Sequence, residues 1–595
     1  MSGSPDTQPE AAADKPERGF TGVVYFHGMG RQRHYEEMCR LVEGLDRWVY
    51  RAHESDASRY PAHHLEDLRG RDEELKEGGN TRLVSYMRAQ YQLPSGERQR
   101  VRFYEGYWAP ETSDGTTLRS VALWLGRQWF RPALLLRTPW RGFEQLRRGD
   151  LVALWSSPAS ERLREGGRNQ LPPLVGMYHD FHGMEARRRY PRGRFRDFLA
   201  LLGAREDGAT FVPAAKAWRR FHVLRQAWNW VLVTTIFVAA LAIFLGVYES
   251  ASWALGAVST WFPSLARLSF GATALQATLG ILAVLGGGRF LTEYLGDVQQ
   301  FATYEEAQAL YRRRSAILEE SCRLLRHVLS NPACERLVVV GHSLGSAVAL
   351  DSLLSLRRSN AVANPQDPLE GPLPLKKIEY FITLASPIDK INYFFSAVHS
   401  RIHRYERLAD DLRGDIGSPP FSKVGRQPHI HWINFWDRGD IIGGPIHTLA
   451  GVHMRRQRVD NVRIAQFRLP DPGASHNAYF VNEKVLESIF RVVFFGEWGF
   501  ARIPPPPKGS AAQYPWLGPG KGSAIQNVLL GLLIALPWIG LLAVLALTRA
   551  EGAWLFGGFL LVPAVFLVAG AVTHRLRLDR QLRPPGARTS PSSPA

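Results

Sequence analysis

The residues most able to do chemistry in this chain surround Ser343. Residues 337–350 read LVVVGHSLGSAVAL, in which a β-branched run leads into Gly-x-Ser-x-Gly and then into small and apolar residues at helical spacing. This order predicts a strand, a sharp turn and a helix. Gly341 and Gly345 are needed because such a turn packs the strand closely against the helix. We expect the hydroxyl of Ser343 to project above the sheet at the N-terminus of the helix, where negative charge is favoured and a nucleophile can act.

This segment resembles the nucleophile elbow of the lipase and esterase branch of the α/β-hydrolase superfamily, in which GHSLG is a familiar form. The resemblance covers the chain in two pieces, residues 19–110 and 301–500. It implies an α/β-hydrolase fold with a mostly parallel sheet, a Ser-His-Asp triad and an acyl-enzyme intermediate. It implies no metal and no organic cofactor.

An early glycine-containing segment resembles the strand and loop that supply one oxyanion donor in this family. Residues 22–30 read GVVYFHGMG, a hydrophobic run that ends in His-Gly. A tetrahedral intermediate needs preorganised N–H groups directed at its developing negative charge. The resemblance implies that the backbone N–H groups of Met29 and Leu344 are these donors. We expect His27 to be structural and not a base.

The acid of the triad has three candidates. Residues 431–445, HWINFWDRGDIIGGP, read as a strand that runs into a loop with two aspartates. The family places its acid just after this strand, and Asp440, followed by two isoleucines, fits that pattern better than Asp437. Asp389, which follows the preceding strand in ITLASPID, is the third candidate. A carboxylate is needed there because it fixes the tautomer of the catalytic histidine and stabilises its imidazolium form.

The base is expected in a late loop, residues 471–481, which read DPGASHNAYFV. His476 in this loop resembles the His-x-x-Tyr ending of the family, and it follows the serine and the aspartate in the expected chain order. The chain has 18 histidines, and the alternatives to His476 are His342, His429, His431, His447 and His453. We expect His476 to take the proton of Ser343 as the serine attacks an ester-type carbonyl.

Long apolar runs predict four transmembrane helices, because a bilayer crossing needs about 20 apolar residues. The runs are residues 228–248, 268–288, 524–548 and 552–573. Arginine, lysine and histidine flank the outer ends of both pairs, so the positive-inside bias predicts a bacterial cytoplasmic membrane with both termini and the hydrolase domain in the cytoplasm. Two of these spans, residues 228–248 and 268–288, lie between the strand near residues 23–26 and the strand at residues 338–340. Because two crossings return the chain to the same side of the membrane, these strands can pair in one sheet.

These features predict the organisation of the whole chain. The expected segments are 1–18, a disordered N-terminus; 19–227, the first part of the hydrolase domain with a cap or membrane-docking insertion; 228–290, a transmembrane hairpin; 291–500, the second part of the hydrolase domain; 501–523, a Pro/Gly linker; 524–573, a second transmembrane hairpin; and 574–595, a basic, disordered tail. The N-terminal segment lacks the apolar core of a secretory signal peptide.

The amino-acid composition limits the classes of binding partner that we expect. The formal net charge is +18, but no zinc-finger spacing or arginine-rich arm accompanies it, so we expect a lipid bilayer and no nucleic acid as partner. The alternative is that the arginine excess reflects only the codon usage of a GC-rich genome. The three cysteines are too few and too scattered for a disulfide framework or a metal cage.

The sequence therefore predicts a membrane-anchored serine hydrolase that cleaves a lipid or another amphipathic acyl ester. Two alternatives stay open. One is a thioesterase or acyltransferase with the same triad, and the other is a membrane scaffold with a degenerate hydrolase domain.

Overall fold

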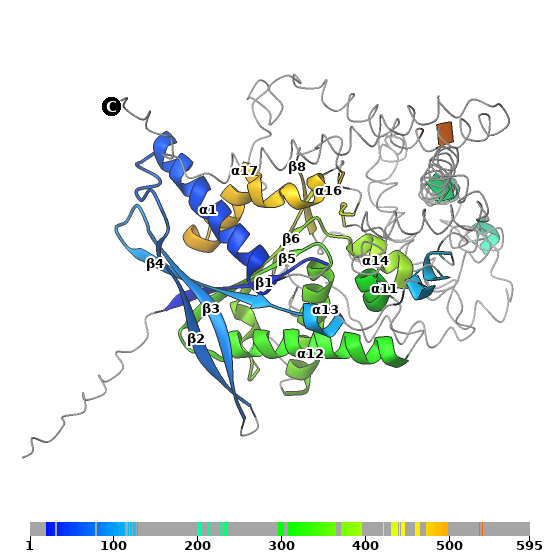
Figure 1. Cartoon of the computed structure of the whole chain (residues 1–595), viewed down its shortest axis with the longest axis horizontal. Coiled ribbons are helices and arrows are strands. Elements are labelled where there is room, and N and C mark those ends of the chain that lie inside the picture. Colours follow the sequence, from blue (N-terminus) through cyan, green and yellow to red (C-terminus); the bar gives the residue numbers. More distant parts are fainter. Residues whose placement is uncertain are drawn as a thin grey trace, which may run out of the picture.

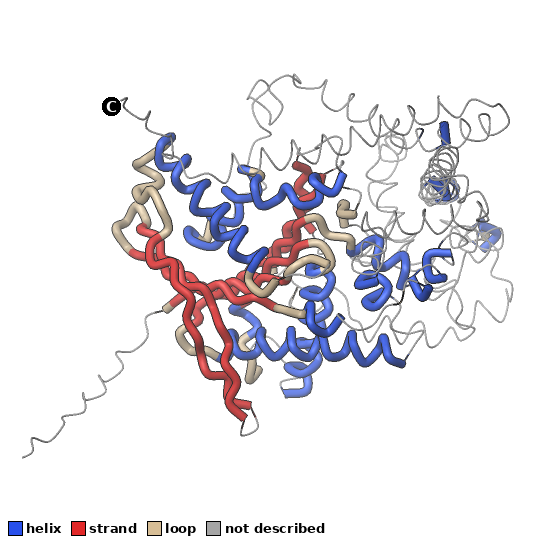
Figure 2. Tube along the Cα trace, in the orientation of Figure 1, coloured by secondary structure: helices blue, strands red, loops and turns tan. Residues whose placement is uncertain are grey.

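The computed structural model describes the parts of the chain that build one sheet and the helices around it. The described residues are 19–29, 33–77, 80–112, 296–302, 308–363, 371–395, 421, 430–437, 440, 442–446, 459–464 and 472–497, with isolated positions between 117 and 235 and between 535 and 539. Figure 2 shows these residues in colour and the remainder of the chain in grey.

A mixed sheet of eight strands lies at the centre of this structure, in the order β2-β3-β4-β1-β5-β6-β7-β8 (Figure 1). The strands are β1 (Phe20–Phe26), β2 (Glu66–Glu77), β3 (Asn80–Gln92), β4 (Arg98–Gly106), β5 (Cys334–His342), β6 (Ile378–Leu384), β7 (His431–Asp437) and β8 (Val459–Ile464). All pairings from β4 to β8 are parallel, whereas β2–β3 and β3–β4 are antiparallel. The parallel strands bring their carboxyl ends to one edge, where sites of α/β proteins form.

The middle of the sheet joins two distant parts of the chain. Strand β1 lies between β4 and β5, and Val23 is in register with both Phe103 and Val338. The β-branched run that precedes Ser343 is thus a central strand. Its residues are covered on both sides, which explains why it is a continuous hydrophobic run and not an alternating one.

Helices cover both faces of the sheet (Figure 1). They are α1 (Glu36–Ser55), α11 (Gly296–Ala302), α12 (Gln308–Ser330), α13 (Gly345–Ala363), α14 (Ile388–Phe395), α16 (Pro472–Asn477) and α17 (Glu483–Phe490), with short 3₁₀ or π turns at Ala109–Thr112, Leu375–Lys377, Ala478–Val481 and Arg491–Phe495. In β1, Val23 and Tyr25 face the core under α1 and α17, whereas Val24 and Phe26 face the core under α12 and α13. This alternation follows from the two-residue period of a strand.

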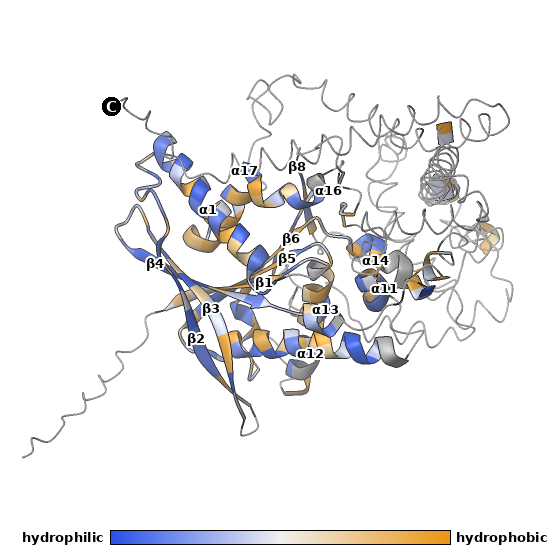
Figure 3. Ribbon diagram, viewed as in Figure 1, coloured by the Kyte–Doolittle hydropathy of each residue, from blue (hydrophilic) through white to orange (hydrophobic). Residues whose placement is uncertain are grey.

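The edge of the sheet at β2 differs from its centre. Figure 3 shows β2 largely in the hydrophilic colour, and its sequence EDLRGRDEELKE is dominated by charged residues. Glu73 on this strand pairs with His327 of α12 at 2.8 Å and also with Arg102 of β4. Charged side chains on an edge strand discourage pairing with another chain.

The structure corrects the fold class expected from the sequence, which was an α/β-hydrolase fold with four transmembrane helices. The described residues form a mixed sheet with helices, and none of their helices has both the length and the apolar character that crossing a bilayer requires. Isolated positions apart, the predicted spans lie outside the described residues, as do the expected terminal segments 1–18 and 574–595 and the linker 501–523. The prediction of spans depended only on the length of the apolar runs and their lack of charge.

Candidate active site

Ser343 lies in the turn between the end of β5 and the start of α13, as its glycine spacing predicts. Its φ is 51°, in the left-handed region that non-glycine residues rarely adopt. Such a conformation costs on the order of 1–3 kcal/mol and persists only where its surroundings impose it. The N–H of Ser343 donates to the carbonyl of Leu384 at the end of β6, at 2.9 Å, which anchors the strained turn to the neighbouring strand.

The two glycines of the turn are required by close packing. A Cβ atom at Gly341 would lie 2.7 Å from the Cα of Ser346, inside the first turn of α13. A Cβ atom at Gly345 would lie 2.3 Å from the carbonyl oxygens of both Phe26 and His27. Because backbone atoms cannot yield by so much, only glycine lets α13 start directly against the end of β1.

The structure brings Ser343, His476 and Asp440 into one hydrogen-bonded series. Nε2 of His476 lies 2.8 Å from Oγ of Ser343, and its Nδ1 lies 3.0 and 3.1 Å from the two carboxylate oxygens of Asp440. With Nδ1 protonated toward the carboxylate, Nε2 is left to accept the serine proton. All three side chains are buried, and Ser343 is 0% exposed.

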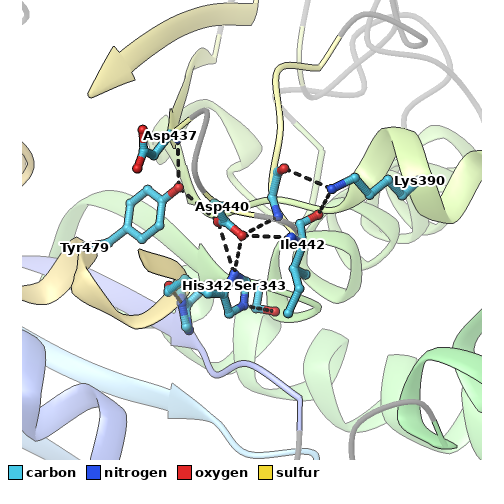
Figure 4. A network of polar contacts seen from close by, with 9 residues as sticks. His342, Ser343, Lys390, Asp437, Asp440, Ile442 and Tyr479 are labelled. Atoms are coloured by element: carbon cyan, nitrogen blue, oxygen red, sulfur yellow. Dashed lines mark hydrogen bonds and ion pairs between the residues drawn. The ribbon is translucent and has the colours of Figure 1, made fainter. Parts of the chain in front are cut away.

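A tight turn after β7 fixes the carboxylate of Asp440. One oxygen accepts the backbone N–H groups of Ile442 and Gly443 at 2.8 and 2.9 Å, and the other accepts the hydroxyl of Tyr479 at 3.1 Å. From α14, the ammonium group of Lys390 donates to the carbonyls of Ile442 and Gly443 at 2.7 and 3.1 Å, which holds the same turn from its other side. Figure 4 shows Asp440 between Tyr479 and this turn.

The surroundings of the two titratable groups favour a neutral imidazole beside an ionised carboxylate. Burial lowers the pKa of His476 below its usual value, although the carboxylate of Asp440 acts in the opposite direction. Burial alone would raise the pKa of Asp440, but His476, the N–H of Gly443 and the charge of Lys390 outweigh it and hold that pKa at about 2. An imidazole that is neutral at pH 7 can accept a proton, as a general base must.

Of the described residues, the other acid candidates form no hydrogen bond with the imidazole. In the described part of the chain, the ring nitrogens of His476 bond Asp440 and Ser343, and neither Asp437 nor Asp389. Asp437 is the last residue of β7, and its backbone N–H donates to the hydroxyl of Tyr479 at 3.0 Å. Asp389 lies in the first turn of α14.

The histidines weighed against His476 lie in different places. His431 is the first residue of β7 and therefore lies at the amino end of a parallel strand, opposite the edge that holds Ser343. His342 is buried beside the site, with a role that the sequence did not reveal. His429, His447 and His453 are outside the described residues.

The predicted oxyanion donors belong to two segments that pack against each other. Met29 follows β1 and Leu344 follows Ser343, and both are buried. A Cβ atom at Gly28 would lie 3.2 Å from Cβ of Ser343, so the loop after β1 runs directly past this serine. This approach is compatible with N–H groups from both segments acting on one oxygen.

His27 supports this loop, as expected for a structural histidine. Its Nε2 accepts the backbone N–H of Trp108 at 3.1 Å, and its Nδ1 then donates to the carbonyl of Gly28 at 2.8 Å. Its ring stacks on the Trp108 indole, and burial lowers its pKa to about 4. His27 is therefore a neutral side chain that fixes the loop.

Sequence reasoning missed the supporting residues of the site. Tyr479 was noted as an aromatic neighbour of His476, but its bridge between Asp440 and the end of β7 had no sequence signal, and neither had the contacts of Lys390. Among the residues that the structure describes, no group of three or more His, Cys, Asp or Glu side chains could hold a metal ion.

Comparisons with known proteins leave this site to be interpreted from its own geometry. The chain matches no protein-family model, and searches of curated proteins and of solved structures found no match. The chemistry of the site is therefore inferred from a hydroxyl, an imidazole and a carboxylate in hydrogen-bonded order at the carboxyl ends of parallel strands.

Proposed function

We propose that this protein is a serine hydrolase that cleaves carboxylic esters through an acyl-enzyme, with Ser343 as nucleophile, His476 as general base and Asp440 as the acid that orients it. The observation that supports this most directly is the hydrogen-bonded series Ser343–His476–Asp440 on a strained turn. A purely structural turn at this left-handed φ would be less strained with a glycine than with a serine. A serine at this position, with a neutral imidazole 2.8 Å from its hydroxyl, therefore has no evident structural purpose.

The proposed reaction uses each group in turn. As Oγ of Ser343 bonds to the ester carbonyl carbon, Nε2 of His476 takes the hydroxyl proton and Asp440 stabilises the imidazolium. The N–H groups of Met29 and Leu344 donate hydrogen bonds to the negatively charged oxygen that was the ester carbonyl. The C–O bond to the alcohol breaks, and the alcohol leaves with the proton from His476. Water, deprotonated by His476, then attacks the acyl carbon, and the bond from that carbon to Oγ of Ser343 breaks. His476 returns the proton to Oγ, which frees the carboxylic acid and restores Ser343.

Carboxylic esters are the substrate class that we propose. The expectation of a lipid substrate rested on the predicted membrane spans, and no helix in the described residues could cross a bilayer. Because Ser343 is 0% exposed, a substrate must also gain access to the site before it reacts.

Labelling with a small fluorophosphonate tests the proposal. We expect a single covalent adduct, mapped by mass spectrometry to the peptide that contains Ser343, and turnover of p-nitrophenyl esters with an initial burst. Ser343→Ala should abolish both. The matched control is Ser352→Ala, which removes another fully buried hydroxyl, one that bonds the carbonyl of Val348 in α13 at 2.8 Å.

Two outcomes contradict the proposal. One is labelling that is as strong in Ser343→Ala as in the wild type. The other is a folded wild-type protein that neither reacts with the probe nor hydrolyses esters, which favours the degenerate scaffold.

A further inference from the structure

A second buried carboxylate–histidine pair lies beside the triad and takes no part in the steps above. Glu37 comes from the first turn of α1, and His342 immediately precedes the nucleophile. Oε2 of Glu37 lies 3.3 Å from Nδ1 of His342, and the two side chains are only 4% and 2% exposed. They are separated by 305 residues in the chain.

The partners of this pair define its charge. Nε2 of His342 lies 3.2 Å from the carbonyl oxygen of His476, which can only accept, so this nitrogen carries a proton. Oε2 of Glu37 accepts the hydroxyl of Tyr25 at 2.8 Å and the N–H of Gly28 at 2.9 Å, as an ionised carboxylate does. Nδ1 of His342 therefore donates to Glu37, and His342 is an imidazolium.

The electrostatics of the pair agree with that geometry. Burial acts to lower the pKa of His342, but the carboxylate of Glu37 outweighs it and raises that pKa above its usual value. Burial likewise acts to raise the pKa of Glu37, but His342 and the N–H of Gly28 outweigh it and hold that pKa at about 2. A buried ion pair with its remaining hydrogen bonds satisfied is costly to break, because removal of one partner leaves an isolated buried charge.

The pair connects the segments that must meet at the nucleophile. Through Glu37 it holds the N–H of Gly28, in the peptide just before the predicted oxyanion donor Met29. Through His342 it holds the backbone of His476. A Cβ atom at Gly28 would lie 3.1 Å from Nδ1 of His342, so the loop, the pair and the turn of Ser343 form one packed unit.

We propose that Glu37 and His342 form a positioning ion pair that holds the loop after β1 and the segment that carries His476 against Ser343. This role rests on the proposed ester hydrolysis. Neither side chain touches the reacting atoms, and no proton moves through the pair. Its effect is to set the distance from base to nucleophile and the position of the loop that carries Met29, on which the rate of acyl transfer depends.

The test compares Glu37→Gln, His342→Gln and the double variant in the full chain, with p-nitrophenyl butyrate as substrate and kcat expressed per phosphonate-titrated site. We expect each single variant to lower kcat about 10- to 100-fold, the range of one lost charge-assisted hydrogen bond, with KM within about threefold. The kcat of the double variant should be no more than about threefold below that of the less active single variant, because the two residues act as one unit.

The matched control is Glu73→Gln, which removes a carboxylate from another histidine pair, Glu73–His327, at the β2 edge of the sheet. This control should leave kcat per titrated site unchanged even if it lowers the melting temperature. Titrating the sites separates positioning from stability, because a merely destabilised protein has fewer active sites but the same kcat for each.

A second measurement works without catalysis. Hydrogen exchange, followed by mass spectrometry in the Ser343→Ala background, should be faster over residues 20–29 and 472–482 in Glu37→Gln than in Glu73→Gln. If the wild type reacts with no ester or phosphonate, the proposed function fails, and exchange alone then decides whether the pair positions the two segments. The positioning role is overturned if both single variants keep kcat within about threefold of the wild type, or if exchange over both segments is the same in Glu37→Gln and Glu73→Gln.

Discussion

Replacement of Asp440 by asparagine tests the assignment of the acid most sharply. The carboxylate accepts four donors, which are Nδ1 of His476, the hydroxyl of Tyr479 and the N–H groups of Ile442 and Gly443. An asparagine keeps the shape of the side chain but has a single acceptor oxygen. Because both backbone N–H groups bind the same oxygen, the amide oxygen of the asparagine should stay with them. Its NH₂ group should then replace the other oxygen, which lies 3.1 Å from Nδ1 of His476.

The size of the effect follows from the tautomer of His476. An NH₂ group donates to Nδ1, so the ring proton moves to Nε2, the nitrogen 2.8 Å from Oγ of Ser343. The imidazole then has no lone pair for the serine proton. In a serine protease with the same triad, this change of aspartate to asparagine imposes the wrong tautomer and lowers kcat by about 10⁴-fold. We expect a similar loss here, which corresponds to about 5 kcal/mol of transition-state stabilisation.

The assay is the rate of p-nitrophenyl ester hydrolysis at pH 8, with the melting temperature recorded for each variant. Asp437→Asn is the matched control, since it makes the same chemical change in a neighbouring buried aspartate that does not hydrogen-bond the His476 ring. It should keep kcat within about fivefold of the wild type, the scale of a change that leaves the tautomer intact.

Two results would refute the reasoning. The first is an Asp440→Asn protein that is folded and keeps more than about a tenth of the wild-type kcat, since the tautomer would then not matter. The second is a larger loss of kcat in Asp437→Asn than in Asp440→Asn. That result would make Asp437 the acid.

Two further predictions concern pH and packing. Burial lowers the pKa of His476, and the reaction needs the neutral imidazole. We therefore expect kcat/KM to be level above that pKa and to fall as pH falls through it, with a midpoint below 6.5. A profile measured from pH 5 to 9 with a midpoint above 7 would contradict this. Gly345→Ala should destabilise the protein by about 2–3 kcal/mol, because its Cβ would lie 2.3 Å from two carbonyl oxygens. At Gly70 a Cβ would meet nothing within 4 Å, so equal melting temperatures for Gly345→Ala and Gly70→Ala would show that the close approach is not rigid.

The sequence predicted the local geometry around Ser343 because that geometry is encoded by neighbouring residues. The β-branched run became β5, and the small and apolar residues after Gly345 became α13. The strand before Asp440 was also predicted, and it corresponds to β7. These segments could be found because the strand, the turn and the helix each have a local pattern.

Features that depend on contacts between distant residues could not be predicted. Strands β2, β3 and β4 were not foreseen, because β2 is rich in charged residues at the edge of the sheet and has no alternating apolar pattern. Glu37 and His342 were not recognised as a pair, since 305 residues separate them and only the folded chain brings them together. The fold class was wrong to include four transmembrane helices, since none of the helices in the described residues could cross a bilayer. Length and lack of charge were the only signals used for that prediction.

The central place of β1 has a consequence for synthesis of the protein on the ribosome. Its neighbour β4 follows soon after it, but its other neighbour, β5, is about 315 residues further along the chain. At about 5–20 residues per second, translation needs roughly 15 to 60 seconds to reach β5. Throughout that time one side of β1 lacks its partner strand, and an unpaired strand edge is a template for aggregation. The nascent chain must therefore be protected well before Ser343 has been made.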